Sequence, residues 1–218
     1  MRLTSLEFAS YLSYLPRSGG GDTGEQSRDL MRALKLGTHT GSPPRSISSQ
    51  VATAIKQRTP ILQMFSRFLG PEFVLVPIPS SSLQQQGSLW VPEELARSLV
   101  EVGLGARVAR LLKRTEAIPK AATSISTQRP TALKHYETLA VQKELLSTKE
   151  FLLVDDVITS GAAMVGSANR LQESYPGSTI RGFAAMRTVS QALSFKSWND
   201  PVVGTITLES SGWCMRHP

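Results

Sequence analysis

The chain has 218 residues, 40% of them hydrophobic, and carries 24 Lys and Arg against 17 Asp and Glu, a formal net charge of +7. A single cysteine, the lack of an export signal, and apolar runs far shorter than the roughly 18 residues of a membrane helix favour a cytoplasmic protein without a membrane span. Because the basic residues form no continuous block, an anionic small molecule is a better expected partner than nucleic acid, which stays possible but less favoured.

The first 50 residues differ in composition from the rest of the chain. A glycine cluster at residues 19–21 indicates a loop, and residues 41–50 are rich in serine and proline, a composition that buries little apolar surface. We therefore expect residues 1–50 to form an N-terminal appendage or hood, partly loop, and residues 51–218 to form the main domain.

From residue 51 onward, the pattern is one of alternating helices and strands. Residues 51–69 carry a helical apolar stripe that Pro60 interrupts, and Pro92 opens another helix. Apolar runs indicate strands at residues 73–78, 107–112, 151–154, 180–186 and 202–208. This order predicts an α/β fold with a mainly parallel sheet flanked by helices. Such sheets bind ligands at the carboxyl ends of their strands.

The most informative stretch is residues 151–165, which read FLLVDDVITSGAAMV. An apolar strand leads straight into Asp155 and Asp156, and a small-residue turn at 159–161 then precedes a helix. Carboxylates accept strong hydrogen bonds from neighbouring sugar hydroxyls, and free backbone N–H groups at a helix start bind phosphate. The parts together favour a sugar-phosphate site over the simpler alternative, in which the acids merely end a strand and the turn caps a helix.

This stretch closely resembles the signature of type I phosphoribosyltransferases, which bind 5-phosphoribosyl-1-diphosphate. The resemblance implies that Asp155 and Asp156 are catalytic, hold the ribose hydroxyls, and contact Mg²⁺ only indirectly, through the Mg²⁺-bound substrate. It further implies a 5-phosphate site made of Thr159, Ser160, Gly161, Ala162 and Ala163. The family often has Thr or Ser at the last of these positions. Ala163 supplies no hydroxyl, so that phosphate contact is missing or comes from a backbone N–H.

A second segment, VPIPSSS at residues 76–82, follows an expected strand. Serine hydroxyls and backbone amides after a strand can bind a diphosphate together with Mg²⁺, although the segment alone reads as an ordinary proline-rich turn. It resembles the equivalent turn of the ComF-like (competence-associated) phosphoribosyltransferases, which implies diphosphate contacts from Pro79, Ser80 and Ser81. ComF-like proteins usually carry arginines shortly after this turn, where residues 84–86 of this chain are all glutamine.

A third segment, residues 111–135, resembles the family's region in which a strand ending in basic residues leads to a mobile loop over the diphosphate. The candidates to neutralise the leaving group are Lys113, Arg114, Lys120 and Arg129, with Lys120 and Arg114 expected to be catalytic. A polar loop with interspersed cations suits a lid that excludes water from the reaction. The alternative is a solvated surface loop with ordinary charges.

The resemblance implies an enzyme that binds 5-phosphoribosyl-1-diphosphate with Mg²⁺, transfers the phosphoribosyl group to a small acceptor and releases diphosphate. A nucleobase is the expected acceptor class, but no base-reading motif identifies it. Two other interpretations stay open: a non-catalytic regulatory protein that keeps the pocket and acts with a nucleic-acid-processing partner, and a nucleic-acid-binding module. The resemblance also makes a homodimer a reasonable expectation.

Overall fold

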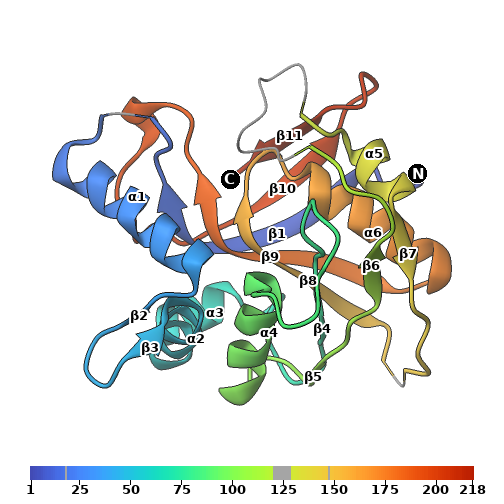
Figure 1. Cartoon of the computed structure of the whole chain (residues 1–218), viewed down its shortest axis with the longest axis horizontal. Helices are drawn as coiled ribbons and strands as arrows, with labels where there is room; N and C mark the ends of the chain where they lie inside the picture. Colours follow the sequence, from blue (N-terminus) through green and yellow to red (C-terminus); the bar gives the residue numbers. More distant parts are fainter. Residues whose placement is uncertain (18, 120–128, 147) are drawn as a thin grey trace.

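The structure, a computed structural model, describes residues 1–17, 19–119, 129–146 and 148–218 (Figure 1). Its main feature is a seven-stranded sheet. In chain order, the strands are β1 (Ser5–Tyr14), β4 (Val74–Pro77), β5 (Arg107–Val108), β8 (Glu150–Ile158), β9 (Thr179–Thr188), β10 (Val202–Leu208) and β11 (Cys214–His217). Their order across the sheet is β11-β10-β1-β9-β8-β4-β5, in which β1, β9, β8, β4 and β5 are parallel to one another and β10 is antiparallel to both of its neighbours, β1 and β11.

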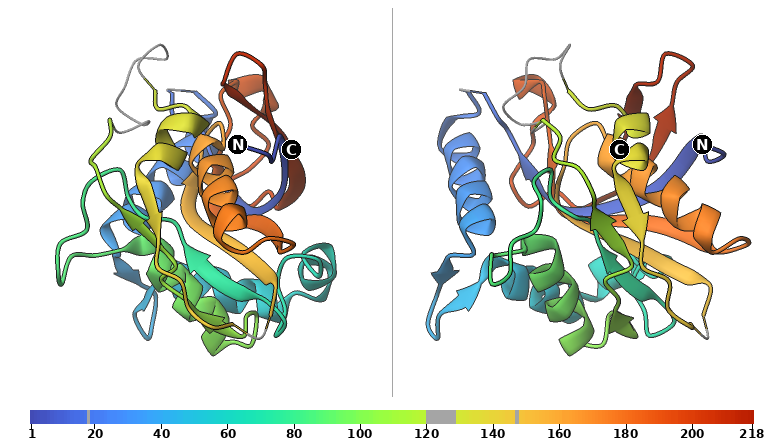
Figure 2. Two further views of the ribbon diagram at one scale, coloured as in Figure 1. Left: turned by 90° about the vertical axis from the view of Figure 1, so that its right-hand side faces the viewer. Right: turned by 45° about the vertical axis from the view of Figure 1, so that its right-hand side comes forward.

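Helices cover both faces of this sheet (Figure 2). Leu152 and Val154 of β8 pack into one apolar cluster and Phe151 and Leu153 into the other, because successive side chains of a strand point to opposite faces. The helices of the first cluster are α1 (Gly21–Leu36), α2 (Ile47–Gln57), α3 (Thr59–Met64) and α4 (Val91–Glu101); those of the second are α5 (Ala132–Glu137) and α6 (Ala162–Ser174). The predicted α/β fold with a mainly parallel sheet flanked by helices is confirmed.

The N-terminal segment is more deeply built into the fold than an appendage. β1 lies inside the sheet, parallel to β9 on one side and antiparallel to β10 on the other. Phe8, Ala9 and Leu12 of this strand are buried in the core. The predicted boundary at residue 50 is therefore wrong for β1, because the alternating polar and apolar residues of this strand complete the sheet. Beyond it, α1 is followed by a small hairpin of β2 (His39–Thr40) and β3 (Arg45–Ser46).

The expected strand at residues 107–112 is two strands in different sheets. β5 pairs with β4 at the edge of the main sheet, and the chain then leaves that sheet through the buried residues Ala109 and Leu111. The next strand, β6 (Leu112–Arg114), pairs instead with β7 (Leu139–Val141) on the α6 side. The sequence pattern of residues 107–112 does not show where one strand ends and the next begins, because apolar residues continue through both. A short 3-10 helix (Ala192–Ser194) lies between β9 and β10.

The parallel arrangement brings the predicted site segments to one edge of the sheet. β4 and β9 are the two neighbours of β8, so residues 78–82 and the end of β9 flank the carboxyl end of β8. This is the edge at which ligands bind in open α/β sheets. No helix in the described part of the chain combines the length and apolar character needed to cross a membrane.

Candidate functional site

The predicted acid pair lies within a strand rather than just after one. β8 continues past the buried residues 151–154 through Asp155 and Asp156 and ends at Ile158. The backbone N–H of Asp156 donates to Asp155 Oδ1 (2.9 Å), and that of Val157 donates to Asp156 Oδ1 (2.7 Å). Each carboxylate is thus oriented by the backbone directly after it. Oδ1 of each residue thus accepts one backbone hydrogen bond.

The two carboxylates have different electrostatic environments. Asp156 is buried, while Asp155 is half-buried. Burial, followed by repulsion from Asp156, raises the pKa of Asp155 well above the ordinary carboxyl range, and the Lys35 ammonium offsets only part of this rise. Asp155 therefore takes up a proton far more readily than an exposed carboxylate does.

The predicted phosphate turn leads into a helix, as expected. Thr159, Ser160 and Gly161 separate β8 from α6, and Gly161 directly precedes the first helical residue. In the described part of the chain, the backbone N–H groups of residues 160–163 have no acceptor, as at the start of any helix. These groups and the positive end of the helix dipole make the start of α6 suitable for an anion.

Gly161 is required by the backbone and by a neighbouring strand. Its φ is 89°, a left-handed conformation that glycine adopts without strain. A Cβ at this position would lie 2.7 Å from Ile206 Cδ1 on β10. The absence of a side chain at Gly161 thus lets the turn pack closely against Ile206 of β10.

The predicted diphosphate loop, residues 78–82, lies beside the acid pair. The N–H of Ile78 donates to the carbonyl oxygen of Val154 (2.9 Å), so the loop starts level with the residue before Asp155. Among the described residues, the backbone N–H groups of 80–82 have no acceptor. Ser80 and Ser81 thus keep free donors, whereas Pro79 is buried and has no N–H to donate.

Arg114 has a different role from the one that we predicted. It is 3% exposed, and its Nε donates to the carbonyl oxygen of Ser80 (3.0 Å). Its Nη1 donates to Thr138 Oγ1 (2.6 Å), while its Nη2 lies 3.5 Å from the carbonyl oxygen of Pro79 and 3.3 Å from His135 Nδ1. Burial lowers the pKa of Arg114 to about 10. The arginine is therefore a support for the loop, because buried backbone carbonyls occupy the donors that a leaving diphosphate would need.

Two of the other predicted cations of this region lie at the surface. Lys113 is exposed on β6, and Arg129 is exposed just before α5. Lys120 lies outside the described residues. The backbone N–H of Ile118 donates to the carbonyl oxygen of Ser81 (2.9 Å), so the third predicted segment does contact the second one.

Sequence reasoning missed Lys35. This residue stands in the last turn of α1, and its Nζ lies 2.5 Å from Asp156 Oδ2. Burial disfavours its charged form, but attraction by Asp156 and then Asp155 outweighs burial and raises the pKa of Lys35. The available signal was a lysine at the end of a short amphipathic stretch, which does not reveal a partner far along the chain.

Arg216 on β11 was also missed. Its Nε donates to the carbonyl oxygen of Thr159 (3.0 Å), and its Nη2 donates to that of Thr188. Nη1 is buried without a hydrogen-bond partner among the described residues, where Arg216 also has no carboxylate within ion-pair distance. Burial, together with the nearby Arg187, lowers the pKa of Arg216 to about 10. A cation without a counter-ion thus lies directly behind the predicted phosphate turn.

The sequence of the chain matches no protein-family model and no curated protein. Within the described ranges, no cluster of three or more His, Cys, Asp or Glu side chains could hold a metal ion.

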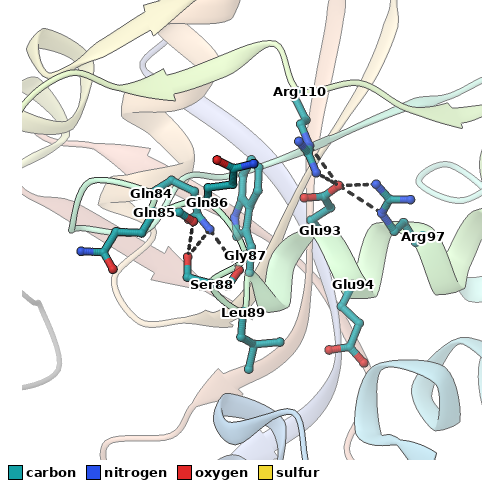
Figure 3. A pocket seen from close by; sticks show the side chains of 11 residues that line it. Gln84, Gln85, Gln86, Gly87, Ser88, Leu89, Glu93, Glu94, Arg97 and Arg110 are labelled. Atoms are coloured by element: carbon teal, nitrogen blue, oxygen red, sulfur yellow. Dashed lines mark hydrogen bonds and ion pairs between the residues drawn. The ribbon is translucent and has the colours of Figure 1, made fainter.

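A cleft of about 800 Å³ is lined by residues 84–90, which include the glutamine run, and by Glu93, Glu94, Arg97 and Arg110 (Figure 3). Glu93 is held between two guanidiniums there, because Arg97 and Arg110 each donate from Nε and Nη2 to its Oε1, at 2.6 to 3.0 Å. Both guanidiniums thus share one carboxylate oxygen. Arg110 also lies over the Trp90 ring, 5.9 Å from its centroid. None of the predicted site residues lines this cleft, whose charged groups support the start of α4.

Proposed function

We propose that the chain is a protein of the type I phosphoribosyltransferase kind, closest to the ComF-like branch. It would bind 5-phosphoribosyl-1-diphosphate and transfer the phosphoribosyl group to a small acceptor. The observation that carries this proposal is the order of groups along one sheet edge: free N–H groups at 80–82, the acid pair, and free N–H groups at 160–163. A ligand with hydroxyls between two phosphate-bearing ends matches that order of donors and acceptors.

Each part of the site has a separate task in this proposal. Asp155 Oδ2 and the Asp156 carboxylate would accept hydrogen bonds from the ribose hydroxyls. The start of α6 would hold the 5-phosphate, and the loop at 80–82 would hold the diphosphate with its backbone N–H groups and serine hydroxyls. The hood expected from the sequence would be α1, whose Lys35 reaches the acid pair.

The residues present fit the expected Mg²⁺. This ion takes oxygen ligands and usually binds through one or two carboxylates, several waters and the phosphates of a substrate. Asp155 and Asp156 offer carboxylate oxygens beside the diphosphate loop, so a dedicated protein cage is not required. When bound, the ion would neutralise part of the diphosphate charge.

The chemistry needs position and charge rather than a protein nucleophile. The bond between C1 of the ribose and the diphosphate oxygen breaks, and the diphosphate keeps the electron pair. The acceptor forms its bond to C1 and loses a proton to solvent, through a cation-like ribosyl transition state akin to that of glycoside cleavage. The acid pair and the turn would hold the ribose in line with the acceptor, which supplies much of the rate enhancement.

The non-catalytic alternative is favoured by one observation, the use of Arg114 for loop carbonyls instead of the leaving group. A protein that binds the ligand without this cation could act as a sensor. The rate at which diphosphate appears in the presence of 5-phosphoribosyl-1-diphosphate separates the two functions, since a sensor releases none above the uncatalysed rate.

The experiment that tests the proposed function is calorimetric titration of 5-phosphoribosyl-1-diphosphate with and without Mg²⁺. The variants are an Asp155→Asn, Asp156→Asn double substitution and, as a control, Asp29→Asn on the exposed face of α1. Loss of the hydrogen bonds that both carboxyl groups make to the ribose should weaken binding by about 3 kcal/mol or more, over a hundredfold. Binding by the double variant equal to that of the wild type, or no binding by the folded wild type, would refute the proposal.

A further inference from the structure

Lys35 reaches the acid pair from the last turn of α1, and the end of this helix has a defined position. Gly37 ends α1 with a left-handed φ of 61° and donates its N–H to the carbonyl oxygens of Ala33 and Leu34. A Cβ at Gly37 would lie 3.0 Å from Leu89 Cδ2, so the end of the helix rests on the segment between β4 and α4. The end of α1, which carries Lys35, thus lies between the acid pair and the chain that follows the proposed diphosphate loop.

The ion pair occupies an acceptor that the proposed substrate needs. Asp156 Oδ1 already accepts the N–H of Val157, and Oδ2 accepts from Lys35. The ammonium occupies one of the two lone-pair sites of Oδ2, so a ribose hydroxyl that binds this oxygen lies beside Lys35. Lys35 has room to move away, because 47% of its side chain is exposed while that of Asp156 is only 10% exposed.

The chemistry of the substrate indicates where the ammonium goes. In 5-phosphoribosyl-1-diphosphate, the carbon that carries the diphosphate is bonded to the carbon that carries the 2-hydroxyl. A cation that touches the carboxylate acceptor of the ribose hydroxyls is therefore within a small side-chain movement of the first diphosphate oxygens. A lysine ammonium has three rotatable donors on a flexible stem, which suits a movement from a carboxylate to a phosphate.

We propose that Lys35 is a catalytic residue of the transfer reaction: its ammonium passes from Asp156 to the diphosphate when the substrate binds. This inference rests on the proposed function and assigns to α1 the cation that Arg114 cannot supply. As the bond from C1 to the diphosphate oxygen breaks, the electron pair stays on the diphosphate, and the fixed ammonium stabilises the charge that develops there. Asp156 is released at the same time to accept a ribose hydroxyl.

The test compares two ligands that differ only in the diphosphate. The affinities of 5-phosphoribosyl-1-diphosphate and ribose 5-phosphate are measured with Mg²⁺ for the wild type, Lys35→Met and Lys35→Arg. The control is Arg32→Met, which removes a cation of the same helix whose partner is the exposed Asp29. Thermal unfolding of each variant checks that the fold is retained.

We expect Lys35→Met to lose at least about tenfold more affinity for the diphosphate ligand than for ribose 5-phosphate, and to release diphosphate at least about tenfold more slowly at saturation. In Lys35→Arg, the ratio of the affinities for the two ligands should stay close to that of the wild type. In Arg32→Met, this ratio should be unchanged. An equal loss for both ligands would show that Lys35 only stabilises the acid pair, which overturns this inference and leaves the proposed function intact. A wild type that binds neither ligand would overturn both.

Discussion

Arg114 Nε donates to the carbonyl oxygen of Ser80 at 3.0 Å, and this bond joins β6 to the loop that follows β4. A buried guanidinium has only donors, so it turns the carbonyl oxygens of the loop toward itself. Trp90 Nε1 binds the carbonyl oxygen of Ile78 (3.0 Å) in the same loop. The N–H groups of residues 80–82 are left free. The direction of the loop donors thus depends on side chains that lie outside the loop.

Replacing Arg114 should therefore destabilise the fold. Arg114→Gln leaves the carbonyl oxygens of Pro79 and Ser80 and the hydroxyl of Thr138 with fewer donors, which should lower the free energy of unfolding by about 2 to 4 kcal/mol. The measurement is urea denaturation. Lys113→Gln, a change at the exposed neighbouring residue, should stay within about 0.5 kcal/mol of the wild type. Equal effects of the two substitutions would contradict the supporting role of Arg114.

His135 should make the protein sensitive to acid. Burial, together with the charge of Arg114, lowers the pKa of His135 to about 3. The unfolded chain therefore binds this proton first, and the free energy of unfolding should fall as the pH drops below about 6.5, by up to about 1.4 kcal/mol per pH unit. His135→Asn should remove this part of the slope, whereas His39→Asn, at an exposed histidine, should not. The free energy of unfolding is measured as a function of pH. Parallel curves for His135→Asn and the wild type would disprove this assignment.

The sequence predicts best those helices and strands whose residue pattern is contained in one short stretch of the chain. The apolar run before Asp155 indicates β8, and the helix after Gly161 follows from its apolar spacing and the small-residue turn. Strand β1 was harder to recognise because its partners, β9 and β10, come from the far end of the chain. The role of β1 depends on pairing over a distance that no local pattern contains.

The charged residues of the site also fall into two groups: those that a local sequence pattern reveals and those that only the fold reveals. Asp155 and Asp156 are recognisable because their strand and turn are adjacent to them in sequence. Lys35 and Arg216 reach the same edge from elements near the two ends of the chain, so only the fold reveals them. Arg114 was given a ligand-binding role because residue type and spacing cannot tell a cation that faces a ligand from one that is buried against carbonyl oxygens.

Gly161 should tolerate substitution less well than a glycine with the same backbone conformation and open space around it. Gly177 has a φ of 75°, and the nearest atom to a Cβ there would be Lys149 Nζ at 3.9 Å. Gly177→Ala should cost about 1 kcal/mol, the price of the left-handed conformation. Gly161→Ala should cost about 1 to 3 kcal/mol more, because its Cβ would meet Ile206. Thermal denaturation of both variants tests this order, and equal costs would argue against a tight contact between the turn and β10.

Arg216 should strengthen binding of the 5-phosphate without affecting recognition of the diphosphate. Its donors hold the carbonyl oxygens of Thr159 and Thr188, and its charge has no carboxylate partner in the described part of the chain. Arg216→Gln should weaken the binding of ribose 5-phosphate and of 5-phosphoribosyl-1-diphosphate by about tenfold each, leaving the ratio of the two affinities unchanged. The control is Arg181→Gln, since Arg181 pairs with Glu7 and Glu150. A change in the ratio would show that Arg216 does not act at the 5-phosphate.

The proposed function requires one ligand to occupy both sets of free backbone N–H groups at the edge of the sheet. Amide hydrogen exchange, measured with and without 5-phosphoribosyl-1-diphosphate and Mg²⁺, tests it most directly because it reports on these groups themselves. The ligand should slow exchange at residues 80–82 and at residues 160–163 together, and the Asp155→Asn, Asp156→Asn double substitution should abolish both effects. Slowing at only one of the two segments, or at the Gln84–Arg97 cleft instead, would show that no ligand spans the two segments.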